Sequence, residues 1–229
     1  MTTLGLIQKG IDYSSIALSD GNEDISFGQL EEYATKLREE AHSGIVVLAA
    51  ENTLKSVSAY IACVQAHLPV LLLDKDVDSS YLQDVATRFS PEVIVGFQHS
   101  VQGFVRTPDS VLGDVQVSTG HIADVNEELC VMLATSGSTG SPKFVKLSRG
   151  NILSNASSIA ESLGINSSER AITSLPFSYT YGLSVINSHI VTGASLFITA
   201  SPVVSAEFWN LVSDGAVTSI AGVPTTYRM

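Results

Sequence analysis

Short runs of branched apolar residues alternate with amphipathic segments along most of this chain. Several runs lack the polar residue at every second position that a half-exposed strand shows, which is typical of strands covered on both faces. These runs are "GIVVLAA" (44–50), "PVLLLD" (69–74), "EVIVG" (92–96) and "LCVMLAT" (129–135). The alternation predicts an α/β fold with largely parallel strands.

Helical spacing of apolar residues marks the segments between these runs. Ser26 and Gln29 form a capping box ahead of a helix expected at 28–40, and Gly164 ends a helix expected at 152–163. The other expected helices lie at 54–66, 79–89, 183–191 and 206–214. Further strands are expected at 14–20 and 24–27 as a hairpin, at 144–148 with one face exposed, and at 171–177, 194–200 and 217–224.

Between residues 97 and 126 the periodicity weakens and Gly, Ser, Pro, Asp and His recur. We interpret this segment as a surface crossing or an irregular hairpin. It is also the best candidate for a boundary between subdomains, so we expect one α/β subdomain at 1–125 and a second at 126–229.

The net charge of the chain limits the kinds of macromolecule that it can be expected to bind. The formal net charge is −11, which disfavours nucleic acid and anionic membranes as partners. There is neither a secretion-type start nor an apolar run of the roughly 18 residues that cross a membrane, so we expect a soluble cytoplasmic protein. Cys63 and Cys130 both lie in apolar runs and are interpreted as buried thiols, and no metal site is predicted from the protein's own side chains.

The stretch "LATSGSTGSPKFVKLS" (133–148) concentrates hydroxyls and glycines between two apolar runs. Gly137 and Gly140 allow a ligand to approach the backbone amides, and Lys143 adds a positive charge. No acidic residue lies between Glu128 and Glu161, so the stretch is locally basic. It is therefore predicted to bind a polyphosphate, with hydroxyl donors at Thr135, Ser136, Ser138 and Thr139.

Other interpretations of this stretch are weaker but stay open. A Walker A loop needs its lysine to open a helix, whereas Pro142 and the strand-like "FVKLS" indicate a chain that turns back as a hairpin. A serine hydrolase or amidase with Ser138 as nucleophile lacks the first glycine of the Gly-x-Ser-x-Gly elbow, and no histidine stands in a matching motif. The histidines are expected to be ordinary surface or core residues: His42, His67, His99, His121 and His189. A surface turn without a ligand is the last alternative.

Residues 135–143, "TSGSTGSPK", resemble the phosphate loop of the AMP-forming adenylating enzymes, which include acyl-CoA synthetases, adenylation domains of nonribosomal peptide synthetases, and luciferases. Two positions depart from that family: Phe144 stands where glycine is usual, and Arg149 in "SRGN" replaces a histidine. The segments 24–41, 61–76 and 221–229 are also similar to the family, with Asp74 interpreted as a polar turn residue. Lys146 and Arg149 are interpreted as solvated charges at a strand end.

The segment "PFSYTYG" (176–182) resembles the family motif that lines the acyl pocket, with Ser178 in place of a phenylalanine. The resemblance implies substrate-binding roles for Tyr179 and Gly182. It also implies the layered α/β/α fold of the family's N-terminal domain.

The activity implied by the resemblance joins a carboxylic acid to ATP, giving an acyl adenylate and pyrophosphate, and then forms a thioester, with coenzyme A as the expected acceptor. Thr139 and Lys143 would be catalytic, the loop from Thr135 to Gly140 would hold the nucleotide, and Mg²⁺ would bridge its phosphates. The resemblance covers only the first half of such an enzyme, so we expect the 229-residue chain alone to be inactive. A carrier-protein-loading adenylation enzyme and a non-catalytic nucleotide-binding fragment remain alternatives.

Overall fold

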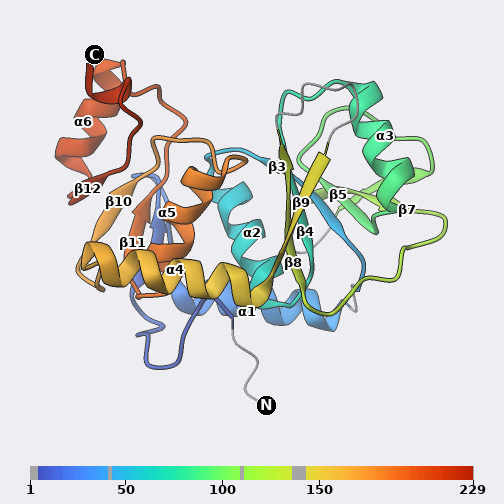
Figure 1. Ribbon diagram of the computed structural model, residues 1–229, viewed down its shortest axis with the longest axis horizontal. Helices are drawn as coiled ribbons and strands as arrows, with labels where there is room; N and C mark the ends of the chain where they lie inside the picture. The colour runs from blue at the N-terminus through green and yellow to red at the C-terminus, as the bar shows by residue number, and fades with distance from the viewer. Residues whose placement is uncertain (1–4, 41–42, 109–110, 136–142, 229) are drawn as a thin grey trace.

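The computed structural model describes residues 5–40, 43–108, 111–135 and 143–228. It contains two mixed sheets, each with a parallel centre, and helices cover both faces of each (Figure 1). The seven-stranded sheet has the order β6-β7-β5-β3-β4-β8-β9, and the five-stranded sheet the order β12-β10-β11-β1-β2. The predicted α/β class and its layered arrangement are confirmed.

The bounds of the elements follow the alternation in the sequence. The strands are β1 (Ile16–Ser19), β2 (Asp24–Ser26), β3 (Val46–Ala50), β4 (Val70–Asp74), β5 (Val93–Val95), β6 (Phe104–Pro108), β7 (Asp114–Ser118), β8 (Leu129–Thr135), β9 (Lys143–Ser148), β10 (Arg170–Ile172), β11 (Ser195–Phe197) and β12 (Ser219–Ile220). The helices are α1 (Phe27–Glu39), α2 (Leu54–Gln65), α3 (Ser79–Phe89), α4 (Arg149–Leu163), α5 (Thr180–Ile190) and α6 (Ala206–Asp214), followed by a 3₁₀ turn at Thr226–Arg228.

Strand β3 shows why the longest apolar runs have no polar alternation. Val46 and Leu48 point into one hydrophobic cluster, whereas Val47 and Ala49 point into another on the opposite face of the sheet. Since successive side chains of a strand point to opposite faces, both sets are buried only when helices cover both sides. The unbroken apolar sequence of β3 therefore follows from its position inside the sheet, where both of its faces are buried.

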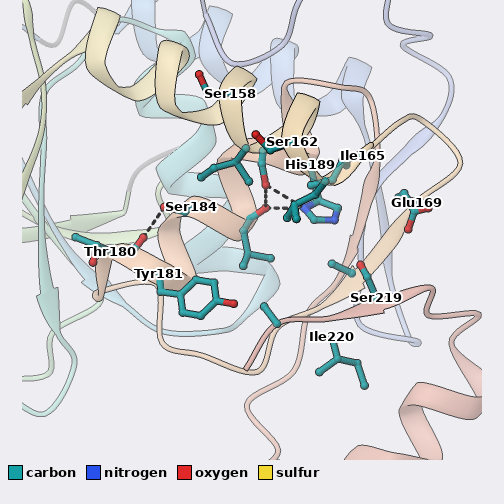
Figure 2. Close-up of a pocket in the computed structure, with 16 residues that line it drawn as sticks. Ser158, Ser162, Ile165, Glu169, Thr180, Tyr181, Ser184, His189, Ser219 and Ile220 are labelled. Carbon is teal, nitrogen blue, oxygen red and sulfur yellow. Dashed lines mark hydrogen bonds between the residues drawn. The ribbon is translucent and has the colours of Figure 1, made fainter. Parts of the chain in front are cut away.

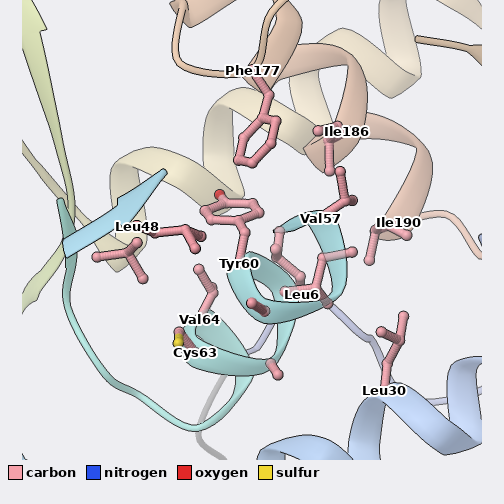
Figure 3. Close-up of a cluster of buried hydrophobic side chains, with 14 of the residues drawn as sticks. Leu6, Leu30, Leu48, Val57, Tyr60, Cys63, Val64, Phe177, Ile186 and Ile190 are labelled. Atoms are coloured by element: carbon pink, nitrogen blue, oxygen red, sulfur yellow. The ribbon is translucent and has the colours of Figure 1, made fainter. Parts of the chain in front are cut away.

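A layer of helices lies between the two sheets and fills the main core (Figure 1). The cluster combines Leu30 of α1, Val57 and Tyr60 of α2, and Ile186 and Ile190 of α5 (Figure 3). On the outer faces, α3 covers the seven-stranded sheet, and α6 covers the five-stranded sheet through Phe208. Both sheets therefore share one central helical layer.

Two helices begin earlier than the apolar spacing predicts, while α1 begins with the predicted capping box between Ser26 and Gln29. Helix α4 starts at Arg149 because Ser148 and Asn151 form a second capping box. Helix α5 starts at Thr180 rather than at residue 183. Its first turn contains a threonine and a glycine, which are poor helix formers, so propensity gives no signal there.

The weakly periodic segment 97–126 forms a more regular hairpin than expected. Strands β6 and β7 pair antiparallel, and β7 continues the seven-stranded sheet from β5. The edge strand β6 is mostly exposed, with Val105 58% accessible, which explains its weak apolar pattern. The expected division into 1–125 and 126–229 does not coincide with the sheets, because β1 pairs with β11 and β4 pairs with β8.

Cys63 and Cys130 are both buried thiols outside any disulfide, as predicted. Burial raises the pKa of the Cys130 thiol to about 11, so this thiol stays protonated and unreactive at neutral pH. No helix in the described part of the chain has the length and apolar character needed to cross a membrane.

A hydrogen bond in the central layer gives a first test of the packing. The fully buried Tyr60 hydroxyl donates to Asn187 Oδ1 at 2.9 Å, which ties α2 to α5. Tyr60→Phe leaves that buried carbonyl without this donor, so we expect a loss of about 1–3 kcal/mol in the free energy of unfolding. Tyr13→Phe, at a residue that is 50% exposed, should stay within about 0.5 kcal/mol of the wild type. Equal denaturation midpoints for both variants would contradict the structural role of this bond.

Candidate functional site

The predicted phosphate loop is carried by an antiparallel hairpin. Strands β8 and β9 pair so that Thr135 lies opposite Lys143. Lys143 is exposed and begins a strand, and α4 begins only at Arg149. The predicted hairpin is thus confirmed, and a Walker A arrangement, in which the lysine opens a helix, does not fit.

Several of the predicted binding residues lie outside the described residues, namely Ser136, Gly137, Ser138, Thr139 and Gly140, as does the nucleophile of the hydrolase alternative, Ser138. Their roles stay predictions. What the structure gives is the base of the loop. Because Thr135 and Lys143 are strand partners, the chain leaves and re-enters the sheet at one point.

Phe144, which stands where the family usually has glycine, anchors the hairpin to α3. Its ring meets Phe89 edge to face with centroids 4.9 Å apart, and the Arg88 guanidinium lies 5.7 Å from the Phe144 ring centroid. Aromatic and cation–π contacts of this kind stabilise by roughly 0.5–1.5 kcal/mol each. The departure from the family pattern therefore adds packing between β9 and α3.

Arg149 corrects one prediction from the sequence. Lys146 is an exposed charge on β9, as expected, but Arg149 is partly buried, and its Nη1 donates to Val64 O at 2.7 Å. Arg38 similarly donates to Gln65 O at 2.8 Å. Two cations thus satisfy carbonyls at the C-terminal end of α2, where positive charge is favourable. The interpretation of Arg149 as a solvated charge is wrong, and the reason is tertiary, because Val64 lies 85 residues away in the sequence.

The two predicted substrate residues lie at the N-terminal end of α5. Tyr179 is the N-cap residue, is 61% exposed, and makes no side-chain cap. Gly182 is buried in the first turn, and a Cβ there would lie 2.3 Å from Pro176 O. Gly182 therefore has a structural requirement of its own, since only glycine lets the preceding turn approach this helix so closely.

Two cavities flank α5, and its first turn borders both. The larger has a volume of about 830 Å³ and lies between α4, α5, β10 and β12 (Figure 2). The smaller, of about 440 Å³, extends to Leu133 of β8 and Leu147 of β9. Thr180 and Ser184 line both cavities. The beginning of α5 thus lies between the phosphate-loop hairpin and the larger cavity, which we call the α4–α5 cavity.

The walls of the α4–α5 cavity are mainly apolar, with Ile159, Val185 and Ile220 among them. Its polar groups include His189, whose Nδ1 lies 2.8 Å from Val185 O. Burial lowers the pKa of the His189 imidazole, although the bond to Val185 and the charge of Glu169 act in the opposite direction. Sequence reasoning gave His189 no role, and no local motif distinguishes it from the other histidines.

The chain's own side chains offer no metal centre in the described ranges, since they contain no group of three or more His, Cys, Asp or Glu residues arranged to hold an ion. Asp74, at the end of β4, accepts a hydrogen bond from the Asp76 amide at 2.9 Å, which is the polar turn role expected for it.

Comparisons with known proteins agree with this geometry. The chain is 25% identical to the acyl-CoA ligase sidI of Aspergillus fumigatus over 226 residues, covering 89% of this chain and 38% of that protein. Its fold is similar to apo MatB from Rhodopseudomonas palustris, with a TM-score of 0.77 at 19% identity, covering 97% of this chain and 49% of that one. ATP-bound MatB gives a TM-score of 0.75 at 21% identity. At such identities these structures support the fold alone, and the chain spans less than half the length of these relatives.

The family model described as "AMP-binding enzyme" matches residues 12–229. That match includes both sheets, the β8–β9 hairpin and the whole of α5. The chain therefore belongs to the AMP-binding enzyme family.

Proposed function

We propose that the protein provides the N-terminal part of an AMP-forming carboxylic acid ligase. The observation that carries the proposal is the β8–β9 hairpin, whose strands are connected through the sequence "TSGSTGSPK". The smaller cavity touches this hairpin at Leu133 and Leu147, and it adjoins the apolar α4–α5 cavity at Thr180 and Ser184. Acid and nucleotide would meet near Thr180. The acyl group would then pass to a thiol, for which coenzyme A is our proposed acceptor and a carrier protein the alternative.

The N-terminal end of α5 suits the carboxylate of the acid. The first N–H groups of a helix have no intrahelical acceptor, and they carry a partial positive charge. Tyr179 does not cap them with its side chain. Thr180 and Ser184 add hydroxyls where the two cavities adjoin. We propose that the carboxylate lies here and that the rest of the acid extends into the α4–α5 cavity.

In the proposed reaction a carboxylate oxygen attacks the α-phosphorus of ATP, and the bond from that phosphorus to the pyrophosphate oxygen breaks. Negative charge then grows on the departing pyrophosphate. Hydroxyls and amides from Thr135 to Gly140, together with the Lys143 ammonium, would stabilise this charge more in the transition state than in bound ATP. Mg²⁺, when bound to the phosphates, would supply further charge neutralisation.

The test is pyrophosphate exchange into ATP in the presence of a panel of carboxylic acids, using protein expressed from its complete reading frame. We expect exchange that depends on the acid, because the adenylate forms reversibly only when an acid is bound. ATP hydrolysis that releases phosphate without any acid, or an esterase activity lost on Ser138→Ala, would contradict the proposal. Thioester formation with coenzyme A or with a pantetheinylated carrier would then identify the acceptor.

A further inference from the structure

One wall of the α4–α5 cavity holds two buried polar atoms for which the described residues provide no hydrogen-bond partner. His189 Nε2 and Ser219 Oγ make no hydrogen bond to any part of the chain that the structure describes, although neither atom is exposed. Both residues line this cavity, from α5 and β12 respectively. Buried polar atoms are usually paired, and leaving one unpaired costs about 1–3 kcal/mol. Two of them beside one cavity indicate a missing ligand group.

The hydrogen bonds made by the cavity wall determine whether the ligand group must donate or accept. Val185 O can only accept, so His189 Nδ1 must carry the proton in their 2.8 Å contact. Because burial lowers the pKa of this imidazole, the ring is neutral at pH 7 and Nε2 presents a lone pair. The nearby Glu169 carboxylate, which accepts from the Thr218 hydroxyl, can also only accept. A matching ligand group must therefore be a hydrogen-bond donor.

The length of α5 sets how far this donor lies from the carboxylate. Thr180 and His189 are nine positions apart on one helix. A helix rises about 1.5 Å per residue, so their Cα atoms lie about 13 Å apart along its axis. Figure 2 shows His189, Ser219 and Glu169 grouped together, with Thr180 and Tyr181 at the other side of the cavity. An extended chain advances about 3.5 Å for every three bonds, so a spacer of about ten bonds covers this length.

We propose that the acid substrate of this site is amphipathic, with an apolar body of about ten bonds and a terminal hydroxyl that donates to His189 Nε2 and pairs with Ser219 Oγ. This inference rests on the proposed function, because it takes the carboxylate to lie at the start of α5. A neutral hydroxyl fits better than an ammonium group, since a charge in a mainly apolar cavity loses much of its hydration.

The test compares three acids of one length: 10-hydroxydecanoic acid, decanoic acid and decanedioic acid. Titration calorimetry at pH 7.5, with protein expressed from the complete reading frame, should show the hydroxy acid binding roughly ten-fold more tightly than decanoic acid. This is the gain in affinity expected from one to two net hydrogen bonds. Decanedioic acid should bind most weakly, because it places an acceptor and a negative charge beside Nε2 and Glu169. In ¹⁵N spectra of histidine-labelled protein, the Nε2 signal of His189 should shift with the hydroxy acid only.

Ser219→Ala should reduce the preference for the hydroxy acid to within about three-fold without lowering stability, because it removes an unpaired buried hydroxyl. His189→Phe should also abolish the preference, and the serine variant keeps the test valid if this one does not fold. Ser158→Ala is the matched control, since it removes an exposed hydroxyl from the same cavity and should preserve the ten-fold ratio.

The outcomes separate the two proposals. Equal binding of 10-hydroxydecanoic and decanoic acids would overturn the terminal-hydroxyl inference and leave the acid-ligase proposal standing. Failure of all three acids to bind, with no acid-dependent pyrophosphate exchange, would overturn both.

Discussion

Thr139→Val is expected to slow acid-dependent pyrophosphate exchange by about 10²–10³-fold, which is the usual loss when one transition-state hydrogen-bond donor is removed. The side chain keeps its shape, so only the hydroxyl is lost. The expected effect is on kcat more than on the KM for ATP, because the hydroxyl is proposed to act on charge that grows as pyrophosphate departs. Initial exchange rates at saturating ATP would measure it.

Thr87→Val provides the matched control for this substitution. Thr87 lies exposed on α3, and its hydroxyl donates only to Gln83 O within that helix. Its exchange rate should equal that of the wild type. Unchanged exchange in Thr139→Val would count decisively against the phosphate-loop role, whereas a parallel loss in both variants would indicate damage to the fold.

Gly182→Ala is expected to lower the free energy of unfolding by about 3 kcal/mol, near the upper end of overpacking effects. The new methyl group would lie 2.3 Å from Pro176 O and 2.8 Å from Leu175 O. These are backbone atoms, so the clash can be relieved only if the turn before α5 moves away from the helix. Chemical denaturation monitored by circular dichroism would measure the loss.

Gly150→Ala makes the same change in the first turn of α4 and serves as its control. Outside the backbone of its own helix and its chain neighbours, the nearest atom to a Cβ at Gly150 would be Ser148 Oγ at 3.7 Å, an ordinary contact. Alanine should raise stability there by about 0.5–1 kcal/mol, because it restricts the unfolded chain and favours the helix. If both glycine variants were equally stable, the close approach at Gly182 would not be a real constraint on the fold.

The sequence predicted the central strands and the hairpin at the phosphate loop because their signals are local. Continuous apolar runs mark β3, β4 and β8, and Pro142 before Lys143 indicates a return strand. The start of α5 and the hairpin of β6 and β7 were less clear. At the start of α5, close packing requires a glycine, which is a poor helix former. In the β6–β7 hairpin, the exposed edge strand β6 carries few apolar residues.

The site was only partly predictable for a different reason. Tyr179 and Gly182 entered through resemblance to a family motif. The structure places them at the start of α5, but neither residue lines the α4–α5 cavity or the smaller one, and their substrate-binding roles stay predictions. His189 and Ser219 had no signal, since the wall that joins them is made by α5 and β12, which are distant in sequence. The bond from Arg149 to Val64 depends in the same way on tertiary structure, because the start of α4 meets the end of α2 only in the folded state.

The helical layer shared by the two sheets has a consequence for how this polypeptide unfolds. The two sheets share the main hydrophobic cluster, because that cluster takes side chains from both of them. In addition, β1 from the start of the chain pairs with β11 from near its end. A protease that cuts near residue 125 would therefore leave two pieces that hold each other in place, and neither piece would retain a finished sheet after they separate. Heating should accordingly melt the two sheets together, in a single cooperative step.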